Sequence, residues 1–206
     1  MVEAASGGKT GFDDAGMKNA IGTYAQPLDT LVIPSLIAAL PPRELLSGYG
    51  EMLKHALLDT PDHWQQLLQL DLETEAGVQA LMSLIERSRA LKNRIVQIDP
   101  REQGLRRALN LGHTIGHALE AHMLAAGQPQ PHGYCVVWGM VGALYLSVLR
   151  CGFPREVLHQ LEQTMLRYYG RPICNCRDQS QLLTLMQQDK KNTAEGIRFT
   201  LLRRIG

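Results

Sequence analysis

The stretch Asn110–Glu120 reads Asn-Leu-Gly-His-Thr-Ile-Gly-His-Ala-Leu-Glu. At about 100° per residue, its apolar residues fall on one side of a helix and its polar residues within a narrow arc on the other. The apolar side holds Leu111, Ile115, Ala118 and Leu119, and the polar arc holds Asn110, His113, His117 and Glu120. The pattern predicts a helix over about residues 110–126, with one face packed against a core.

The histidines of this stretch have a spacing that suits a metal ion. His113 and His117 are four residues apart, so both imidazoles can reach one ion from the same face. Thr114 stands where the His-Glu-x-x-His motif has glutamate, which removes the base of a metalloprotease. A third imidazole, His132, lies at the head of the next helix, and Glu51, His113 and His132 would offer zinc one carboxylate and two imidazoles. A histidine pair at this spacing is more often structural or solvated, so both interpretations stay open at this point.

The rest of the chain is mostly helical by pattern. Helices are predicted over residues 43–58, 76–98, 132–151, 155–169 and 179–188, bounded by prolines and glycines. The first forty residues are rich in glycine and predict loops with one or two short strands. Residues 197–201 alternate between apolar and polar side chains, which predicts a strand. The fold class is therefore mainly α, with a Gly-rich loop and strand segment over 1–40 and a helical domain over 41–206.

Composition excludes several classes of function. The chain has 206 residues, of which 45% are hydrophobic, enough to bury a core, and its net charge of +1 gives no basic field for nucleic acid. Four cysteines do not make a disulfide scaffold, so we expect reduced thiols and a cytoplasmic location. The first residues do not resemble a signal peptide. The most apolar run, residues 134–149, is shorter than the roughly 18–20 residues of a spanning helix, so no membrane contact is expected.

Three features have an ordinary and a functional interpretation. In the helix over 43–58, charged residues share the side opposite the apolar one, which by itself indicates a solvated face. Lys92 lies on the apolar stripe of the helix over 76–98, where a lysine must snorkel to water or meet an anion. The stretch Ser6–Gly11 lacks the first glycine of a Walker A motif, because position 3 is glutamate. Its backbone amides and Lys9 can still hold an anion.

Several motifs in this order resemble the 3-dehydroquinate synthase family of the shikimate pathway. The matching stretches span nearly the whole chain: Gly7–Gly11, Lys18-Asn19, Leu40–Glu44, Gly48–Lys54, Arg106–Glu120, His132-Gly133, Asp189–Lys191 and Leu201–Gly206. Several motifs together are far more specific than any one of them. The resemblance implies the C-terminal helical fold of that family.

The resemblance also implies roles for the matching positions. Zinc, with cobalt as an alternative ion, would be bound by Glu51, His113 and His132. The catalytic residues would be His117, Lys54 and Asn110. The substrate's carboxylate, hydroxyls and phosphate would meet Lys9, Lys18, Asn19, Lys54, Lys92, Arg106, Asn110, His117 and one of Lys190 and Lys191. The NAD edge would be formed by Lys9, Lys18, Asn19, Leu40 and Glu44.

The family's chemistry converts 3-deoxy-D-arabino-heptulosonate 7-phosphate to 3-dehydroquinate and phosphate through transient NAD-dependent oxidation at a zinc site. A nucleotide-binding α/β domain is expected before the Gly-Gly-Lys motif, and the sequence holds no Gly-x-Gly-x-x-Gly fingerprint. We therefore expect the metal- and substrate-binding half of the enzyme, homodimeric as the family suggests and without turnover by itself.

Two other functions stay open on the sequence. The chain departs from the family's usual residues at Glu3, Ala4, Ala39 and Tyr134. A related sugar-phosphate cyclase would share the fold and the zinc site, and a non-catalytic zinc-binding or dimerising fragment would need no cofactor domain. The retention of Lys92, Arg106, Asn110 and His117 favours the shikimate substrate.

Overall fold

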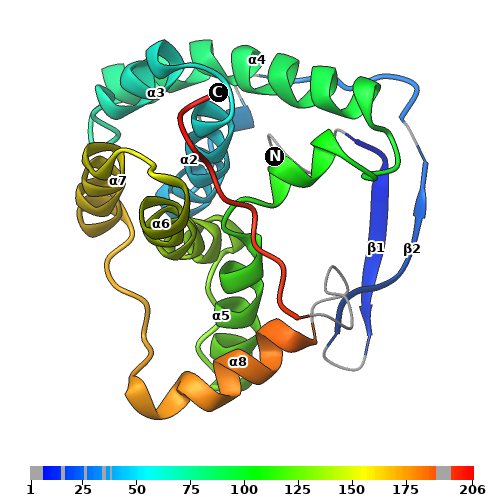
Figure 1. The fold of residues 1–206 in the computed structure, drawn as a ribbon. Coiled ribbons are helices and arrows are strands. Elements are labelled where there is room, and N and C mark those ends of the chain that lie inside the picture. Colours follow the sequence, from blue (N-terminus) through cyan, green and yellow to red (C-terminus); the bar gives the residue numbers. More distant parts are fainter. Residues whose placement is uncertain (1–6, 15–16, 26, 34–35, 38, 189–195) are drawn as a thin grey trace.

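The computed structural model describes residues 7–14, 17–25, 27–33, 36–37, 39–188 and 196–206. Most of these residues are helical (Figure 1), which confirms the predicted fold class. The helices are α2 (Pro42–Leu57), α3 (Pro61–Leu68), α4 (Glu75–Ile98), α5 (His113–Ala125), α6 (His132–Cys151), α7 (Arg155–Tyr168) and α8 (Gln179–Gln187), with short 3-10 helices η1 (Leu105–Asn110) and η2 (Cys176–Asp178).

Prolines, threonines and glycines set the helix boundaries. Pro42 occupies the first turn of α2, where its missing N–H removes no helical hydrogen bond. Thr60 and Thr74 cap α3 and α4, because each hydroxyl accepts a hydrogen bond from a backbone amide three residues on, at 3.2 Å and 3.1 Å. Gly152 ends α6 with a φ of 71°. These local signals explain why most predicted boundaries agree with the structure to within a residue or two.

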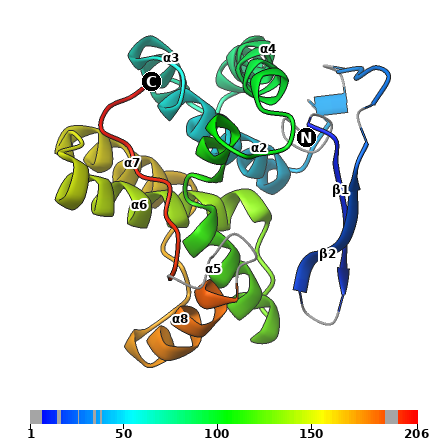
Figure 2. The same cartoon turned by 45° about the vertical axis from the view of Figure 1, so that its right-hand side comes forward.

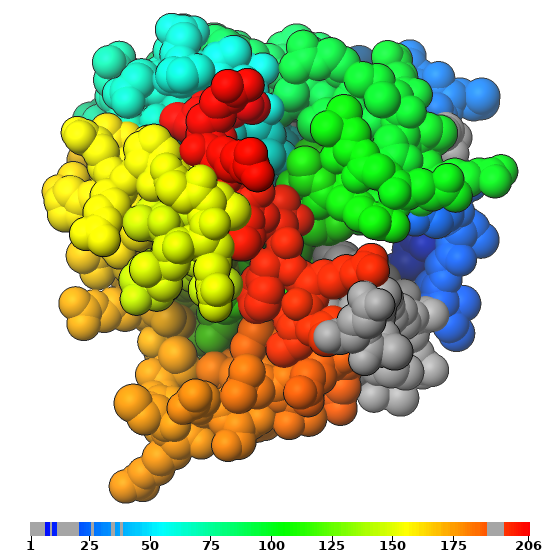
Figure 3. Space-filling model, in the orientation of Figure 1, coloured from blue at the N-terminus to red at the C-terminus, as the bar shows by residue number. Residues whose placement is uncertain are grey.

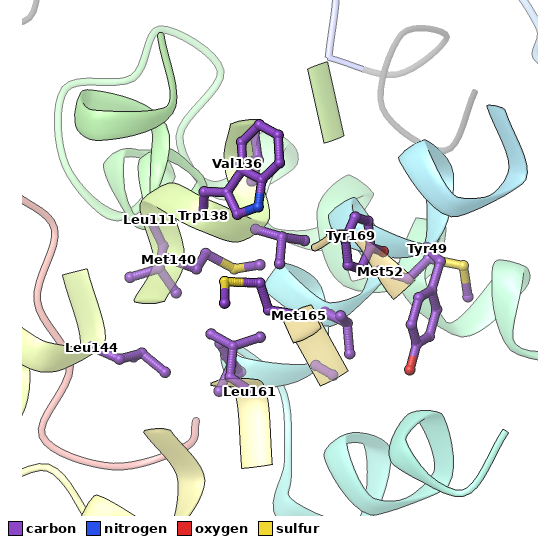
Figure 4. Packing of buried hydrophobic residues seen from close by; sticks show 14 of the residues in the cluster. Tyr49, Met52, Leu111, Val136, Trp138, Met140, Leu144, Leu161, Met165 and Tyr169 are labelled. Atoms are coloured by element: carbon purple, nitrogen blue, oxygen red, sulfur yellow. The ribbon is translucent and has the colours of Figure 1, made fainter. Parts of the chain in front are cut away.

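Helix α6 lies at the centre of the helical body, with α2, α5 and α7 packed against it (Figure 1). The buried side chains of these helices form one cluster, which includes Tyr49, Met52, Leu111, Val136, Met140 and Leu161 (Figure 4). Two glycines let α6 approach its neighbours closely: a Cβ on Gly133 would lie 2.0 Å from Ser47 O, and one on Gly139 would lie 2.0 Å from Gly112 O. The start of α6, with His132, is therefore held against α2 and α5.

By length and composition alone, α6 is apolar enough to cross a membrane. Half of its most apolar window is buried inside the helical body, and the core helix of a soluble protein meets the same criterion. The helix itself confirms the one predicted over residues 132–151.

The predicted helix over 110–126 is wrong at its start. Helix α5 begins at His113, and Asn110 ends the separate 3-10 helix η1. Between them, Gly112 adopts a φ of 77°, and an added Cβ there would lie 2.8 Å from both Met140 N and Val136 O. Because only glycine tolerates this left-handed backbone and this close packing, the chain turns at Gly112. Asn110 consequently leaves the polar arc of the helix.

The predicted strand over residues 197–201 is also wrong, since these described residues carry no strand. Their backbone lies against helices: Arg198 O accepts from Thr114 Oγ1 at 2.9 Å, and Leu202 N donates to Ser147 Oγ at 3.0 Å. A ladder needs a neighbouring strand edge, which the helices do not offer. We call residues 196–206 the strap; Figure 3 shows it in red, crossing the surface between α6 and α7 on one side and α4 and η1 on the other.

Strands β1 (Lys9–Asp14) and β2 (Met17–Tyr24) form an antiparallel hairpin with Lys9 opposite Tyr24. The hairpin confirms the expectation of short strands in the first forty residues. Figure 2 shows it standing to one side of the helices. The division of the chain at residue 40 into two domains stays a prediction.

Candidate metal and anion site

Three imidazoles and one carboxylate converge where α2, α5 and α6 meet. One ring nitrogen from each of His113, His117 and His132 lies within 4.8 Å of the other two. Glu51 Oε1 lies 3.3 Å from His132 Nε2 and 3.9 Å from His113 Nε2. The structure thus brings the predicted ligands Glu51, His113 and His132 together, and it places His117 beside them.

Two of these imidazoles are oriented through the nitrogen that faces away from Glu51. His113 Nδ1 lies 3.1 Å from the carbonyl oxygen of Leu111, and His132 Nδ1 lies 3.0 Å from Glu120 Oε2. A carbonyl or a carboxylate behind the ring is the usual support of a metal-ligating histidine, because it fixes the tautomer and directs Nε2 toward the ion. The polar arc of α5 therefore supplies a supporting carboxylate as well as imidazoles.

The ionisation of His132 reflects the two carboxylates around it. Burial disfavours its cationic form, but hydrogen bonds with Glu120 and Glu51 outweigh burial and raise the pKa of His132 to about 9. A cation is therefore favoured at this point between Glu51 and Glu120. A metal ion bound at Nε2 would replace the proton that faces Glu51, while Nδ1–H would still donate to Glu120.

The charged side of α2 is buried rather than solvated. Lys54 is 1% exposed, and its Nζ lies 2.6 Å from Glu51 Oε2. Glu51 is 4% exposed, so the interpretation of a solvated face is wrong for this part of α2. Two buried charges are stable only when they are paired and hydrogen-bonded. The pair therefore links a predicted metal ligand directly to a predicted substrate-binding cation.

Two further cations are buried on α4 and η1. Lys92 is 4% exposed, so its side chain does not snorkel to water. Arg106 is 3% exposed, and it donates from Nη1 to Pro100 O at 2.7 Å and from Nη2 to Gly7 O at 2.6 Å. A guanidinium has five N–H donors, and two of them are used by these carbonyls, as far as the described residues show. Arg106 thereby joins the Gly-Gly-Lys stretch to η1.

Sequence reasoning missed Glu102, whose carboxylate Oε1 accepts a hydrogen bond from Asn110 Nδ2. Glu102 has a φ of 58°, a left-handed backbone that costs free energy for a residue other than glycine. The loop is held by Asp99, whose carboxylate accepts from the amides of Gln103, Gly104 and Arg106 at 2.7–3.0 Å. These backbone hydrogen bonds keep the pKa of Asp99 low. Glu102 belongs to no spacing motif in the sequence. What distinguishes it is its left-handed backbone angle, which only the structure shows.

The remaining predicted residues are placed only in part. Lys9 lies in β1, and Lys18 and Asn19 lie in β2. Glu44 is exposed in the first turn of α2, and Leu40 is half-buried just before it. The predictions for Glu3, Ala4, Lys190 and Lys191 lie outside the described residues. Among the described residues, Cys135, Cys151, Cys174 and Cys176 form no disulfide.

A buried carboxylate among histidines, with buried cations on the adjoining helices, defines a candidate metal-dependent site for an anionic substrate. Comparison with family models makes this class specific. The model described as "3-dehydroquinate synthase C-terminal" matches residues 48–192, and the one described as "3-dehydroquinate synthase N-terminal" matches residues 1–47. The chain belongs to the 3-dehydroquinate synthase family.

Curated relatives agree with this assignment. Over the full chain, the 3-dehydroquinate synthase of Parabacteroides distasonis is 42% identical, and that of Prochlorococcus marinus is 36% identical. The chain spans 58% and 56% of these two proteins.

Solved structures show the same fold. A 2-deoxy-scyllo-inosose synthase complexed with carbaglucose-6-phosphate, NAD+ and Co2+ matches the whole chain with a TM-score of 0.81 at 20% identity. The 2-epi-5-epi-valiolone synthase of Streptomyces hygroscopicus, with NAD+ and Zn2+ bound, matches with a TM-score of 0.78 at 24% identity. The chain covers 56% and 57% of those chains. At these identities the likeness shows the fold alone.

Proposed function

We propose that this chain carries the metal- and substrate-binding half of a 3-dehydroquinate synthase, which converts 3-deoxy-D-arabino-heptulosonate 7-phosphate to 3-dehydroquinate and phosphate. The observation that carries the proposal is the junction of α2, α5 and α6, where Glu51 Oε1 lies 3.3 Å and 3.9 Å from the Nε2 atoms of His132 and His113. The buried Lys54 extends this junction toward an anionic ligand.

The donor chemistry fits zinc. One carboxylate and two imidazoles are ligands that zinc prefers, and three protein ligands leave a position for substrate. The carbonyl behind His113 and the carboxylate of Glu120 behind His132 supply the support that such ligands need. When bound, zinc would supply Lewis-acid polarisation of a substrate hydroxyl, and NAD+ would supply the hydride acceptor.

The chain's own residues then bind the substrate, orient its oxygens and transfer a proton to or from it. Lys92 and Arg106 bind anionic groups of the substrate, since their charges are buried and such charges are stabilised by anions. Asn110 hydrogen-bonds substrate oxygens, with its amide oriented by Glu102. His117 lies beside the ligand cluster and moves a proton at a substrate oxygen.

The nicotinamide cofactor is held mostly by a nucleotide-binding domain, for which the greater length of the relatives leaves room. Lys9, Lys18 and Asn19 of the hairpin, with Leu40 and Glu44 at the head of α2, form its edge in this chain. The working enzyme is a cytoplasmic homodimer, and one of Lys190 and Lys191 completes the substrate site. By itself this half binds zinc but does not turn over, because the first oxidation needs NAD+ held beside the substrate and most of its binding domain lies outside this chain.

The test supplies zinc, NAD+ and the heptulosonate phosphate to these 206 residues and follows phosphate release. We expect no steady release from the chain alone and steady release after addition of a separately made nucleotide-binding domain. Turnover by the chain alone contradicts the proposal. Absence of turnover also contradicts it if the chain and the added domain together bind NAD+ and the heptulosonate phosphate. A parallel assay with glucose 6-phosphate tests the alternative cyclase, which would release phosphate from that sugar instead.

A further inference from the structure

The strap is hydrogen-bonded to η1, α5, α6 and α2. Among the described residues of the helical body, these elements carry all the candidate ligands and anion-binding residues except Lys92 of α4. Thr200 Oγ1 donates to Arg107 O of η1 at 3.0 Å, and Thr114 Oγ1 of α5 donates to Arg198 O at 2.9 Å. Leu202 N donates to Ser147 Oγ of α6 at 3.0 Å, and Gly206 N donates to Leu57 O of α2 at 3.1 Å. One segment thus fastens four separate elements to each other.

Two of these contacts fall directly beside predicted site residues. Arg107 follows Arg106, so the Thr200 hydroxyl donates to the backbone carbonyl of the residue next to the proposed anion-binding arginine. Thr114 follows His113, so the second contact is next to a predicted metal ligand. Thr200 also lines one small hollow together with Asn110. The strap therefore reaches both the anion-binding side and the metal side of the site.

The strap is anchored independently of these two hydroxyls. Leu202 and Ile205 pack against the hydrophobic core, and the side chain of Ser147 is fully buried. A segment held by core packing has few conformations left to lose, so its Thr200 hydroxyl and its Arg198 carbonyl can fix neighbouring backbone at little further cost in entropy. A 3-10 helix such as η1 has poor internal hydrogen bonds and gains from an external one.

We propose that the strap sets the position of the anion-binding turn relative to the metal cluster, with Thr200 as the positioning residue for Arg106 and Thr114 as the positioning residue for His113. This inference rests on the proposed function, because Arg106 and His113 have their roles only there. Neither threonine touches the substrate in it; each acts through the backbone that it holds.

The experiment compares Thr200→Val, which removes the hydroxyl, with Thr200→Ser, which keeps it. The matched control is Thr164→Val, because Thr164 Oγ1 donates at 2.9 Å to a carbonyl of its own helix, α7. Each purified chain is titrated with inorganic phosphate by calorimetry and with zinc by competition with a chelating dye. Amide hydrogen exchange over residues 105–110 is measured without any ligand.

We expect Thr200→Val to bind phosphate about three- to tenfold more weakly, the effect of one hydrogen bond, and to exchange faster over residues 105–110. Its zinc affinity should stay within about twofold of the wild-type value, and Thr200→Ser should behave as wild type. Equal exchange in Thr200→Val and wild type overturns the inference, as does an equal loss of phosphate and zinc binding, which indicates general destabilisation. If the wild-type chain binds no phosphate, the proposed anion site fails, and the exchange measurement still decides whether the strap holds η1.

Discussion

Arg106 Nη2 donates a 2.6 Å hydrogen bond to the carbonyl oxygen of Gly7, a residue 99 positions earlier in the chain. Gly7 has a φ of 95°, and a Cβ added to it would lie 2.7 Å from the same Nη2 atom. The glycine is thus required twice, for its backbone angle and for the space beside the guanidinium. The Gly-Gly-Lys stretch is thus a backbone partner of Arg106, the arginine that we propose binds an anionic group.

We predict that Gly7→Ala displaces Arg106, at a cost of about 1–3 kcal/mol in the free energy of unfolding. Phosphate binding should weaken with it, which calorimetry measures. Gly48→Ala is the matched control, because no atom lies within 4 Å of its added Cβ and the helix interior favours alanine. Wild-type phosphate affinity in Gly7→Ala would show that this contact does not position Arg106.

A second prediction separates strain from function at Glu102. Its left-handed backbone suits glycine, so Glu102→Gly should leave the free energy of unfolding unchanged or raise it by up to about 1 kcal/mol. The same change removes the acceptor for Asn110 Nδ2, so turnover with the added nucleotide-binding domain should fall at least about tenfold.

Urea denaturation and phosphate release measure the two effects of Glu102→Gly. Glu86→Gly, at an exposed position of α4, is the control, since it should lose about 1 kcal/mol of stability and no activity. A Glu102 variant that is less stable and fully active would refute a functional role for the strained backbone.

The helices that were predicted well begin and end at residues with a local signal, such as a cap, a proline or a glycine. The bounds of α6 follow from Pro131 and Gly152, and those of α4 from a threonine cap and Pro100, so a pattern of single residues suffices. Helix α3 was not predicted, because its eight residues give too short a periodic pattern. The long helices and the nine residues of α8 were therefore predicted, whereas α3 was not, although Thr60 and Pro61 mark its start.

The other errors depend on contacts between distant segments. Asn110 leaves α5 because Gly112 packs against α6, and the burial of Lys54 requires α2 to be covered by other helices. Residues 197–201 alternate as a strand does, but their hydrogen-bond partners are helices. The proposed metal ligands were predicted from the resemblance and the His spacing, whereas Glu102 needed the observed backbone angle. Tertiary packing, which a single sequence does not display, decides each of these points.

The buried His63 predicts a dependence of stability on pH. Burial, together with the charge of Arg87, lowers the pKa of His63 below its usual 6.5, although Asp59 Oδ2 lies 3.0 Å from Nδ1. The unfolded chain therefore binds a proton that the folded chain resists as pH falls through about 6.5. This contribution to stability is complete above about pH 6.5 and is lost at lower pH, with a slope of at most about 1.4 kcal/mol per pH unit.

The measurement is the difference in unfolding free energy between wild type and His63→Gln at about pH 7.5, 6.5 and 5.5, on either side of the unperturbed pKa. The difference isolates His63 from His132, whose raised pKa acts with the opposite sign. We expect the wild type to lose more stability than the variant as pH falls. Parallel curves for the two proteins would contradict the role of His63.

Lys92 gives a test of the anion site that leaves the fold in place. Lys92→Met keeps an unbranched side chain of similar length in a buried position, so unfolding should change little. A hydrogen bond to a charged group contributes about 1.5–3 kcal/mol, so the affinity for a phosphonate analogue of the substrate should fall about 10- to 100-fold by calorimetry. The neighbouring Asn93 is exposed on the same helix, so Asn93→Met is the matched control. Unchanged affinity in Lys92→Met would assign this lysine a structural role.

The last prediction decides which donors bind the metal, since the cluster offers two sets of three. With zinc at about 100 times its dissociation constant, wild type should gain about 2.7 kcal/mol of stability, or about 5–10 °C in Tm. His113→Ala and Glu51→Gln should lose this gain, whereas His117→Ala should keep it, because we assign His117 to proton transfer. Glu120→Gln should weaken zinc binding about 10- to 100-fold through His132. His159→Ala, at a largely exposed ring on α7, is the control. Zinc content and Tm with and without a chelator measure all five variants; loss of zinc in His117→Ala with retention in Glu51→Gln would replace the proposed ligands by the three histidines.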